Sequence, residues 1–181
     1  MLNFIDLIFK PIKMKLSTFY ILAAGSIFAA SCSTTKTYSI HSKSGSQVQG
    51  TAKFTQKGNT VELDLNAYKL NPNGIHAAHI HEKGDCSATD GSSAGGHWNP
   101  TSHDHGKWGH GSHHAGDLGN LKADANGTGR LVMSTDKWCL GCSDETKNIY
   151  GKSIIIHEKE DDFKTQPTGN AGGRIGCVEI K

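Results

Sequence analysis

Three features that indicate common classes of protein are missing from this sequence. No segment repeats its apolar residues with a helical period, which excludes a helical bundle and an α/β fold. Residues 1–31 hold three of the 19 lysines and arginines and one of the 17 acids, so the remainder has 16 of each without basic clusters. This balance excludes an extended face for nucleic acid. The longest apolar run, residues 19–31, is too short to span a bilayer comfortably.

The N-terminal segment instead has the pattern of an export signal. Lys13 and Lys15 precede the apolar run, which ends in small residues directly before Cys32. This arrangement resembles a bacterial lipoprotein signal, in which Cys32 becomes the acylated first residue of the mature protein. An ordinary secretory signal is the alternative. Residues before Met14 add nothing to the pattern, so translation could begin at Met14.

We therefore expect residues 1–31 to be a signal peptide and the mature protein to be periplasmic or attached to the cell envelope through a lipid on Cys32. Residues 32–46 are mostly Ser, Thr and Lys, which predicts a flexible tether. A single domain should then span residues 47–181. With Cys32 acylated, four cysteines remain that can form two disulfides, with their pairing open: Cys86, Cys139, Cys142 and Cys177.

Alternation of apolar and polar residues predicts β-strands along this domain. Residues 47–56 and 60–70 alternate in this way on either side of Lys-Gly-Asn, and we expect them to form a hairpin. Residues 120–134 should form a second hairpin around Ala-Asn-Gly-Thr-Gly. Further strands are expected at residues 75–82, 152–158 and 172–181. Six to eight short strands predict an antiparallel sandwich or barrel.

Residues 83–120 form a long Gly-, Ser- and His-rich segment without sustained periodicity. Loops of this length inside a compact domain are usually functional. Three imidazoles and one carboxylate can close a tetrahedral zinc site, and the segment offers such a set in His97, His105, His114 and Asp117. Three more histidines lie among them: His103, His110 and His113.

Four further histidines lie on predicted strands. His79 and His81 are two residues apart, so they share one face of a strand and could reach one ion. His76 is an odd number of residues from His79, and we expect a hydrogen-bonded structural role for it. His157 ends an apolar strand, where a lone histidine is more often structural. The residues thus predict an exported all-β domain that binds metal through histidine, and leave open which histidines share which ion.

Five motifs then resemble one known family in order and approximate spacing: "HAAHIHEKGDC", "AGGHWNP", "HAGDLGN", "IIHEKEDD" and "GNAGGRIGC". The family is the copper/zinc superoxide dismutases, in their bacterial exported form, and the resemblance covers about residues 47–181. It implies a Greek-key β-barrel or sandwich of about eight antiparallel strands, with long metal-binding and electrostatic loops.

The resemblance also implies roles for individual residues. The implied copper ligands are His79, His81, His97 and His157. The implied zinc ligands are His97, His105, His114 and Asp117, so that His97 bridges the two ions. Asp161 matches an aspartate that links a copper-binding histidine to a zinc-binding one. Cys86 and Cys177 match the disulfide of the family.

The implied reaction converts superoxide to oxygen and hydrogen peroxide through a Cu(II)/Cu(I) cycle, while zinc has a structural role. Arg174 matches the arginine that holds superoxide beside copper, and His97 would carry the proton chemistry. The resemblance does not decide whether the chain forms a homodimer. A non-catalytic lipoprotein that stores or delivers metal is the alternative function.

Some residues fall outside this pattern. Cys139 and Cys142 have a C-x-x-C spacing without a surrounding βαβ unit, so we expect a local disulfide, with metal binding as the alternative. The extra histidines noted above match no ligand position and are expected at the surface. Lys159 and Lys164 are the cations available in the short loop before Arg174, where they could steer the substrate or simply be solvated.

Overall fold

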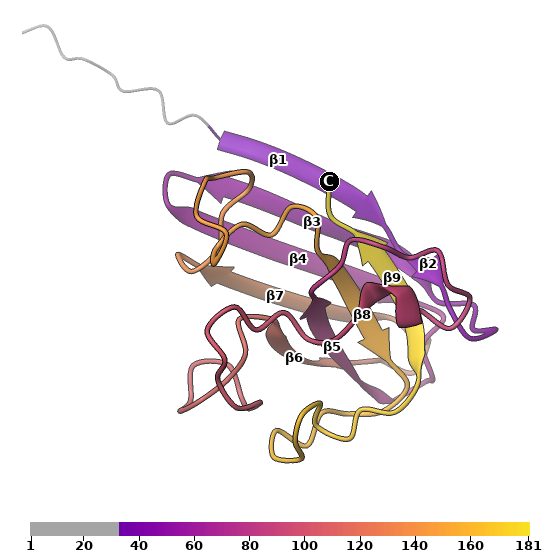
Figure 1. Ribbon diagram of the computed structural model, residues 1–181. Coiled ribbons are helices and arrows are strands. Elements are labelled where there is room, and N and C mark those ends of the chain that lie inside the picture. The colour runs from indigo at the N-terminus through magenta and orange to yellow at the C-terminus, as the bar shows by residue number, and fades with distance from the viewer. Residues whose placement is uncertain (1–32) are drawn as a thin grey trace, which may run out of the picture. The chain divides into compact units, whose positions relative to one another are not determined.

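The computed structural model describes residues 33–181, and the expected signal peptide and Cys32 lie outside the described residues. The described strands form two antiparallel sheets that pack against each other (Figure 1). Within this part of the chain, no helix is long and apolar enough for a membrane span. The expected all-β fold is confirmed.

The first sheet has the strand order β1-β3-β4-β7. Its strands are β1 (Ser33–Ser39), β3 (Gln49–Lys57), β4 (Thr60–Tyr68) and β7 (Gly129–Thr135). The second sheet has the order β2-β9-β8-β5-β6. Its strands are β2 (His41–Ser42), β5 (Ile75–His81), β6 (Asp117–Lys122), β8 (Ser153–His157) and β9 (Arg174–Glu179).

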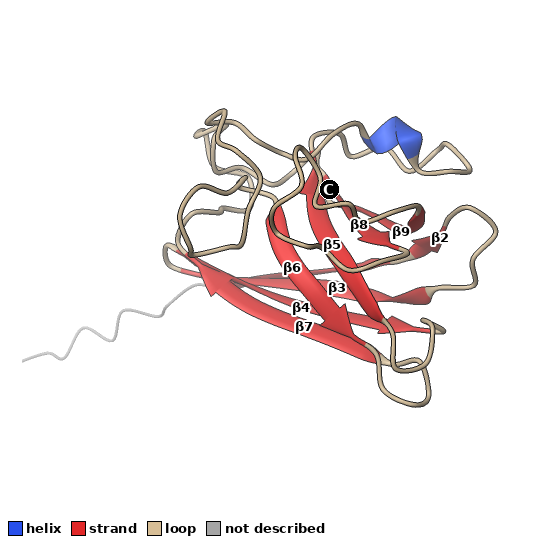
Figure 2. Cartoon of the chain, turned by 90° about the horizontal axis from the view of Figure 1, so that it is seen from below, coloured by secondary structure: helices blue, strands red, loops and turns tan. Residues whose placement is uncertain are grey.

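The hydrophobic core lies between the two sheets (Figure 2). Phe54 and Leu63 from the first sheet and Ile80, Ile154 and Ile156 from the second are fully buried in it. Each side chain of this size contributes about 1.5–3 kcal/mol when it leaves water. The period-two alternation seen in the sequence therefore marks the inward face of each sheet.

The outer face of the second sheet is also covered, and this face carries the histidines. Ile155 points away from the core and packs with Cys86, Ala94 and Cys177 of the loop and of β9. His79 pairs directly with Ile155 across β5 and β8, so it lies on this outer face. The long loop after β5 thus buries the histidine side chains that would otherwise face solvent.

The two expected hairpins have different outcomes. The first is confirmed, because β3 and β4 pair along their length around Gly58, whose φ is 57°. The second is wrong. β6 pairs with β5 and β7 pairs with β4, so the Ala-Asn-Gly-Thr-Gly turn carries the chain from one sheet to the other. Only an isolated bridge between Ala123 and Gly129 remains of the expected pairing.

The prediction that residues 32–46 form a flexible tether is wrong for the part of this segment that forms strands. β1 pairs with β3 over seven residues, and β2 pairs with β9. Most side chains of β1 are exposed; Tyr38 on this strand and Ile40 directly after it reach the core. Backbone pairing rather than apolar composition holds this segment, which is why its composition suggested no strand.

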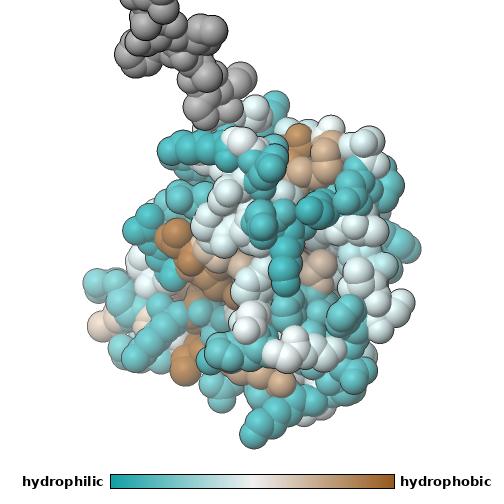
Figure 3. Space-filling view, turned by 90° about the vertical axis from the view of Figure 1, so that its left-hand side faces the viewer, coloured by the Kyte–Doolittle hydropathy of each residue, from teal (hydrophilic) through white to brown (hydrophobic). Residues whose placement is uncertain are grey.

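Hydrophilic side chains cover most of the face shown in Figure 3, and the apolar side chains visible there form several small, separate areas. Small apolar areas of this kind are normal on soluble domains. This face therefore gives no support to a large apolar contact between subunits, and the homodimer stays a prediction.

Candidate metal centre

Backbone pairing at the end of β5 brings the loop histidine to the strand histidines. His97 forms a β-bridge with His81, and Trp98 N–H donates to Ile80 O at 2.8 Å. Gly116 N–H donates to Trp98 O at 3.0 Å, so the second half of the loop returns to the same place. His157, at the end of β8, lies beside them with its ring centroid 4.9 Å from that of His79. The centre is thus built on two neighbouring strands, β5 and β8, and main-chain hydrogen bonds tie the loop to β5.

The first group of potential ligands consists of four buried histidines, each with one ring nitrogen within 4.8 Å of the others: His79, His81, His97 and His157. Four buried nitrogens in this group have no hydrogen-bond partner in the described chain: Nδ1 of His79 and Nε2 of His81, His97 and His157. Buried polar atoms without a partner are rare in proteins because they are costly. Four together, on rings that share one site, fit a metal ion.

The opposite nitrogens of three of these rings are anchored. Nδ1 of His81 lies 2.9 Å from Gly95 O, and Nδ1 of His157 lies 3.3 Å from Gly172 O. Nε2 of His79 lies 3.0 Å from Oδ2 of Asp161. Such contacts set the tautomer and the direction of a ligating ring. The remaining nitrogen of each ring is therefore the one presented to an ion.

The second group is formed by His97, His105, His114 and Asp117, all of them buried. Oδ1 of Asp117 lies 3.0 Å from Nδ1 of His105, 3.1 Å from Nδ1 of His97 and 3.2 Å from Nδ1 of His114. The Nδ1 atoms of His97 and His114 are 3.3 Å apart. Atoms about 3.2 Å apart at the corners of a tetrahedron lie about 2.0 Å from its centre, which is the length of Zn–N and Zn–O bonds. The donor set fits zinc in both chemistry and size.

Asp117 is itself held so that one oxygen stays available. Its Oδ2 accepts hydrogen bonds from the backbone N–H groups of His114, at 2.8 Å, and Gly106, at 3.1 Å. Oδ1 then faces the three imidazoles. Burial raises the pKa of Asp117, but hydrogen bonds from His105, His114 and His97 outweigh it and hold the pKa well below its usual range. The carboxylate is therefore charged, as a zinc ligand must be.

The two groups share His97 and are linked a second time by Asp161. Oδ1 of Asp161 lies 2.9 Å from Nε2 of His105, while its Oδ2 contacts His79 as described above. Burial raises the pKa of Asp161, and hydrogen bonds from His105 and His79 lower it further than burial raises it. One buried carboxylate thus orients a ring in each group.

Burial favours the neutral form of three rings in the first group. It lowers the pKa of His81 to about 2, of His157 to about 3 and of His97 to about 4, and the neighbouring histidines lower those of His81 and His157 further. Neutral imidazole is the form that binds metal. In the second group, burial lowers the pKa of His105, but hydrogen bonds with Asp117 and Asp161 outweigh it and raise the pKa to about 9. A positive charge is therefore favoured between these carboxylates.

Arg174 begins β9 beside the first group, where its charge lowers the pKa of His81 and of His157. Its Nη1 donates to Gly91 O at 2.7 Å and its Nη2 donates to Gly95 O at 2.8 Å. Partial burial lowers its pKa, but guanidinium remains charged at neutral pH. The side chain is thus a fixed cation at the edge of the histidine cluster.

Three residues that support the centre escaped the sequence analysis. The Gln166 side chain accepts from His105 N–H and donates to His105 O, both at 2.9 Å. The Asn120 side chain accepts from Asp161 N–H at 2.8 Å and donates to Asp161 O at 3.0 Å. A Cβ atom at Gly169 would lie 1.9 Å from Oδ1 of Asp161, so this position needs glycine. Asn120 and Gly169 lie inside the quoted motifs "HAGDLGN" and "GNAGGRIGC", but only folding shows which partners they meet.

The other histidines stay outside both groups. Nδ1 of His76 lies 2.9 Å from His157 O, which agrees with the expected structural role, although its Nε2 has no partner among the described residues. The extra histidines at 103, 110 and 113 join neither group. Both expected disulfides are present, Cys86–Cys177 and Cys139–Cys142.

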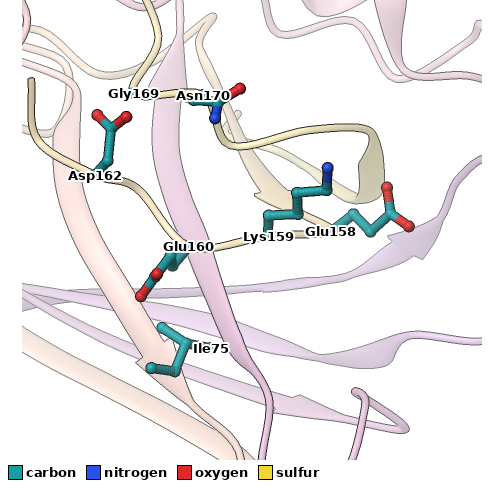
Figure 4. Close-up of a pocket in the computed structure, with 7 residues that line it drawn as sticks. All are labelled: Ile75, Glu158, Lys159, Glu160, Asp162, Gly169 and Asn170. Carbon is teal, nitrogen blue, oxygen red and sulfur yellow. The ribbon is translucent and has the colours of Figure 1, made fainter. Parts of the chain in front are cut away.

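A hollow of about 510 Å³ (Figure 4) is lined by none of the ligands of either group. Three carboxylates and one ammonium line it: Glu158, Glu160, Asp162 and Lys159. Negative charge predominates there, so this hollow would repel a small anion. Lys159 therefore has its charge compensated locally, which makes it a poor candidate for steering an anionic substrate.

Fold and site together define a β-sandwich metalloprotein whose two ligand groups share one histidine. A sequence profile described as copper/zinc superoxide dismutase matches residues 48–180. The chain therefore belongs to the copper/zinc superoxide dismutase family, an oxidoreductase family that uses copper and zinc.

Individual relatives agree with this assignment. The chain is 34% identical over 164 residues to Cu-Zn superoxide dismutase 2 of Aquifex aeolicus, covering 87% of this chain and 95% of the relative. It is 40% identical over 149 residues to an extracellular Cu-Zn superoxide dismutase of Drosophila melanogaster, covering 74% and 76%. A crystal structure of a SOD-like protein from Bacillus subtilis matches with a TM-score of 0.71 and 34% identity, covering 80% of this chain and 97% of that one.

Proposed function

We propose that the chain is a superoxide dismutase with copper in the first ligand group, zinc in the second and His97 between them. The observation that supports this most is the position of His97, whose Nε2 belongs to one group while its Nδ1 lies 3.1 Å from Asp117 in the other. A simple metal store has no need for one ring that faces two sites. Histidine-only and histidine-carboxylate donor sets suit copper and zinc respectively.

In this proposal the protein supplies binding, orientation and protons. Copper bound by the first group would supply one-electron redox chemistry, through which one superoxide would be oxidised to oxygen and a second, with two protons, reduced to hydrogen peroxide. Arg174 holds the anion beside the first group through its charged guanidinium. His97 holds and releases a proton at Nε2, the nitrogen that faces this group. The zinc group orders the loop that carries His97.

A dismutation assay of the copper- and zinc-loaded protein tests the proposal. We expect high activity, lost when copper alone is removed by a chelator. The alternative of a non-catalytic metal-binding lipoprotein predicts bound metal, measured by mass spectrometry, without dismutation. Metal content at one copper and one zinc per chain with no activity would overturn the enzyme assignment.

The Arg174→Ala variant tests the anion-holding role. We expect the rate to fall by about 10-fold or more, because a charge-assisted contact to the substrate is worth about 1.5–3 kcal/mol. Metal content should not change, since within residues 33–181 the guanidinium hydrogen-bonds to Gly91 O and Gly95 O and to no ligand side chain, and the contact of His81 with Gly95 O remains in the variant. Arg130→Ala is the matched control because that guanidinium pairs with Asp64 on the first sheet. Equal rates in the two variants would show that the anion is guided otherwise.

We also propose that the protein is exported and anchored through an acylated Cys32. Relatives named extracellular superoxide dismutases in Drosophila melanogaster and Caenorhabditis elegans support export. Metabolic labelling with a fatty-acid analogue should mark the wild-type protein and leave Cys32→Ser unlabelled. Equal labelling of both would refute acylation at this residue. Sedimentation velocity of the domain would test the homodimer.

A further inference from the structure

Lys43 is the one lysine that is buried within residues 33–181, with 8% of its surface exposed. It lies before the segment matched by the family profile and outside both ligand groups. Burial of an ammonium is costly unless the group is hydrogen-bonded. Its Nζ donates to Cys86 O, in the loop that follows β5. This buried cation therefore needs an explanation that the metal centre does not supply.

The peptide groups of Cys86 are held from several sides. Glu179 Oε1 accepts a hydrogen bond from Cys86 N–H at 3.2 Å, while Lys43 binds the carbonyl. The disulfide to Cys177 on β9 adds a covalent tie. Opposite charges thus fix the amide and the carbonyl of one residue, which makes it a rigid starting point for the loop that follows.

That loop supplies both carbonyls that hold Arg174. Gly91 and Gly95, whose oxygens accept from the guanidinium, lie five and nine residues beyond Cys86. Gly91 has φ 73°. The side of its Cα where a Cβ atom would lie faces the aliphatic parts of the Arg174 and Lys43 side chains. A Cβ atom there would lie 3.3 Å from Cβ of Arg174 and 3.6 Å from Cγ of Lys43. The two side chains therefore pack on the same glycine.

The backbone around Lys43 contacts the same two elements. Lys43 N–H donates to Ile175 O at 3.0 Å, and Ser44 Oγ donates to Arg174 O at 2.8 Å. Ser44 N–H donates to Thr89 O at 2.8 Å, in the loop. The segment thus joins the start of β9 to the loop whose carbonyls hold the guanidinium.

We propose that Lys43 is a positioning residue for Arg174. Its hydrogen bond to Cys86 O keeps the loop in place, so that Gly91 O and Gly95 O hold the guanidinium in the orientation that receives the anion. The inference deepens the proposed function, on which the role of Arg174 rests. Without the ammonium, Cys86 O is left buried and unpaired, the loop loosens, and the guanidinium loses its fixed acceptors.

Arginine-selective labelling tests this without any enzyme activity. The sequence has two arginines, Arg130 and Arg174, so phenylglyoxal modification of the metal-loaded protein can be followed at each by peptide mass spectrometry. In Lys43→Met we expect Arg174 to react about fivefold faster, as loss of a hydrogen bond worth about 1 kcal/mol allows. Arg130, exposed on the first sheet, is an internal reference and should react at the wild-type rate.

Lys36→Met is the matched control, because it removes the same charge from an exposed position on β1. Unchanged Arg174 labelling in Lys43→Met, or an equal increase in Lys36→Met, would overturn the proposal. If Lys43→Met does not fold, Lys43→Gln replaces it. That side chain keeps a polar head but is one bond shorter, so it no longer reaches Cys86 O, and the same increase is expected.

A second measurement uses the copper-loaded protein. Azide, a small anion, should bind about fivefold more weakly in Lys43→Met by titration of the cupric absorption, with copper content unchanged. An unchanged azide affinity would also overturn the proposal. A metal-loaded protein that has no dismutase activity would refute the proposed function, yet the labelling experiment would still decide whether Lys43 positions Arg174.

Discussion

His97 is the residue on which both ligand groups depend. Its two ring nitrogens point into different groups, and main-chain pairing at His81 and Ile80 fixes the ring between them. Other ligands serve one group each. Any change at this side chain should therefore affect two metals, whereas a change at another ligand should mainly affect one.

The His97→Ala variant should lose zinc and alter copper together. Mutation of a residue that only supports a ligand weakens metal binding by up to about 100-fold. Removal of one of the four zinc donors themselves should therefore weaken zinc binding by more than this. The cupric EPR spectrum should change in the same sample. His103→Ala, a histidine of the same loop outside both groups, is the control and should keep both metals. An unchanged spectrum in His97→Ala would contradict the proposal that His97 bridges the two metals.

At the scale of elements, the loop between β8 and β9 connects the two ligand groups. Asp161 in this loop contacts His79 on β5 and His105 in the other long loop. The Gln166 and Asn120 side chains fasten its surroundings by paired hydrogen bonds to His105 and Asp161. The loop is therefore a support that orients ligands of both groups.

The Asp161→Asn variant should lower metal affinity by about 10- to 100-fold. The amide group of asparagine would face a ring N–H with a second donor, so one of the two orienting contacts is lost. Competition with a chelator, followed by metal analysis, measures the change. Asp162→Asn is the control because that carboxylate binds only residues of its own turn, Lys164 and Thr165. Equal affinities in the two variants would contradict the orienting role.

At the scale of the whole molecule, the two disulfides enclose chain segments of very different length. Cys86–Cys177 spans 91 residues and ties the loop over the second sheet to β9, while Cys139–Cys142 spans three residues within one loop. Closing a long loop removes more conformational freedom from the unfolded chain than closing a short one. The first bond therefore contributes mainly to global stability, and the second mainly fixes the local shape of its loop.

Replacing each cysteine pair by alanine should separate these effects. Loss of Cys86–Cys177 should lower the free energy of unfolding by about 5 kcal/mol, and loss of Cys139–Cys142 by about 2 kcal/mol, on the chain-entropy estimate. Urea unfolding of the metal-free proteins, followed by circular dichroism, measures both. Equal destabilisation would show that strain or residual structure outweighs loop length.

The sequence by itself determined the all-β class, most strand positions and the donor chemistry of the centre. Period-two alternation marks inward faces locally, as at Phe54 and Leu63, and five motifs in order identified the family. That His79 and His81 share one face likewise follows from the geometry of a single strand.

Only the tertiary structure decided which elements meet. Alternation marks the faces of a strand but not its neighbour, so β6 and β7 were expected to pair and instead lie in different sheets. Residues 33–42 are held by backbone pairing that composition does not reveal. The nitrogen that each ligating ring presents, and the contacts of Gln166 and Lys43, depend on partners tens of residues away. Such contacts exist only once two sheets and their loops have packed, because hydrogen bonds act between neighbours in space.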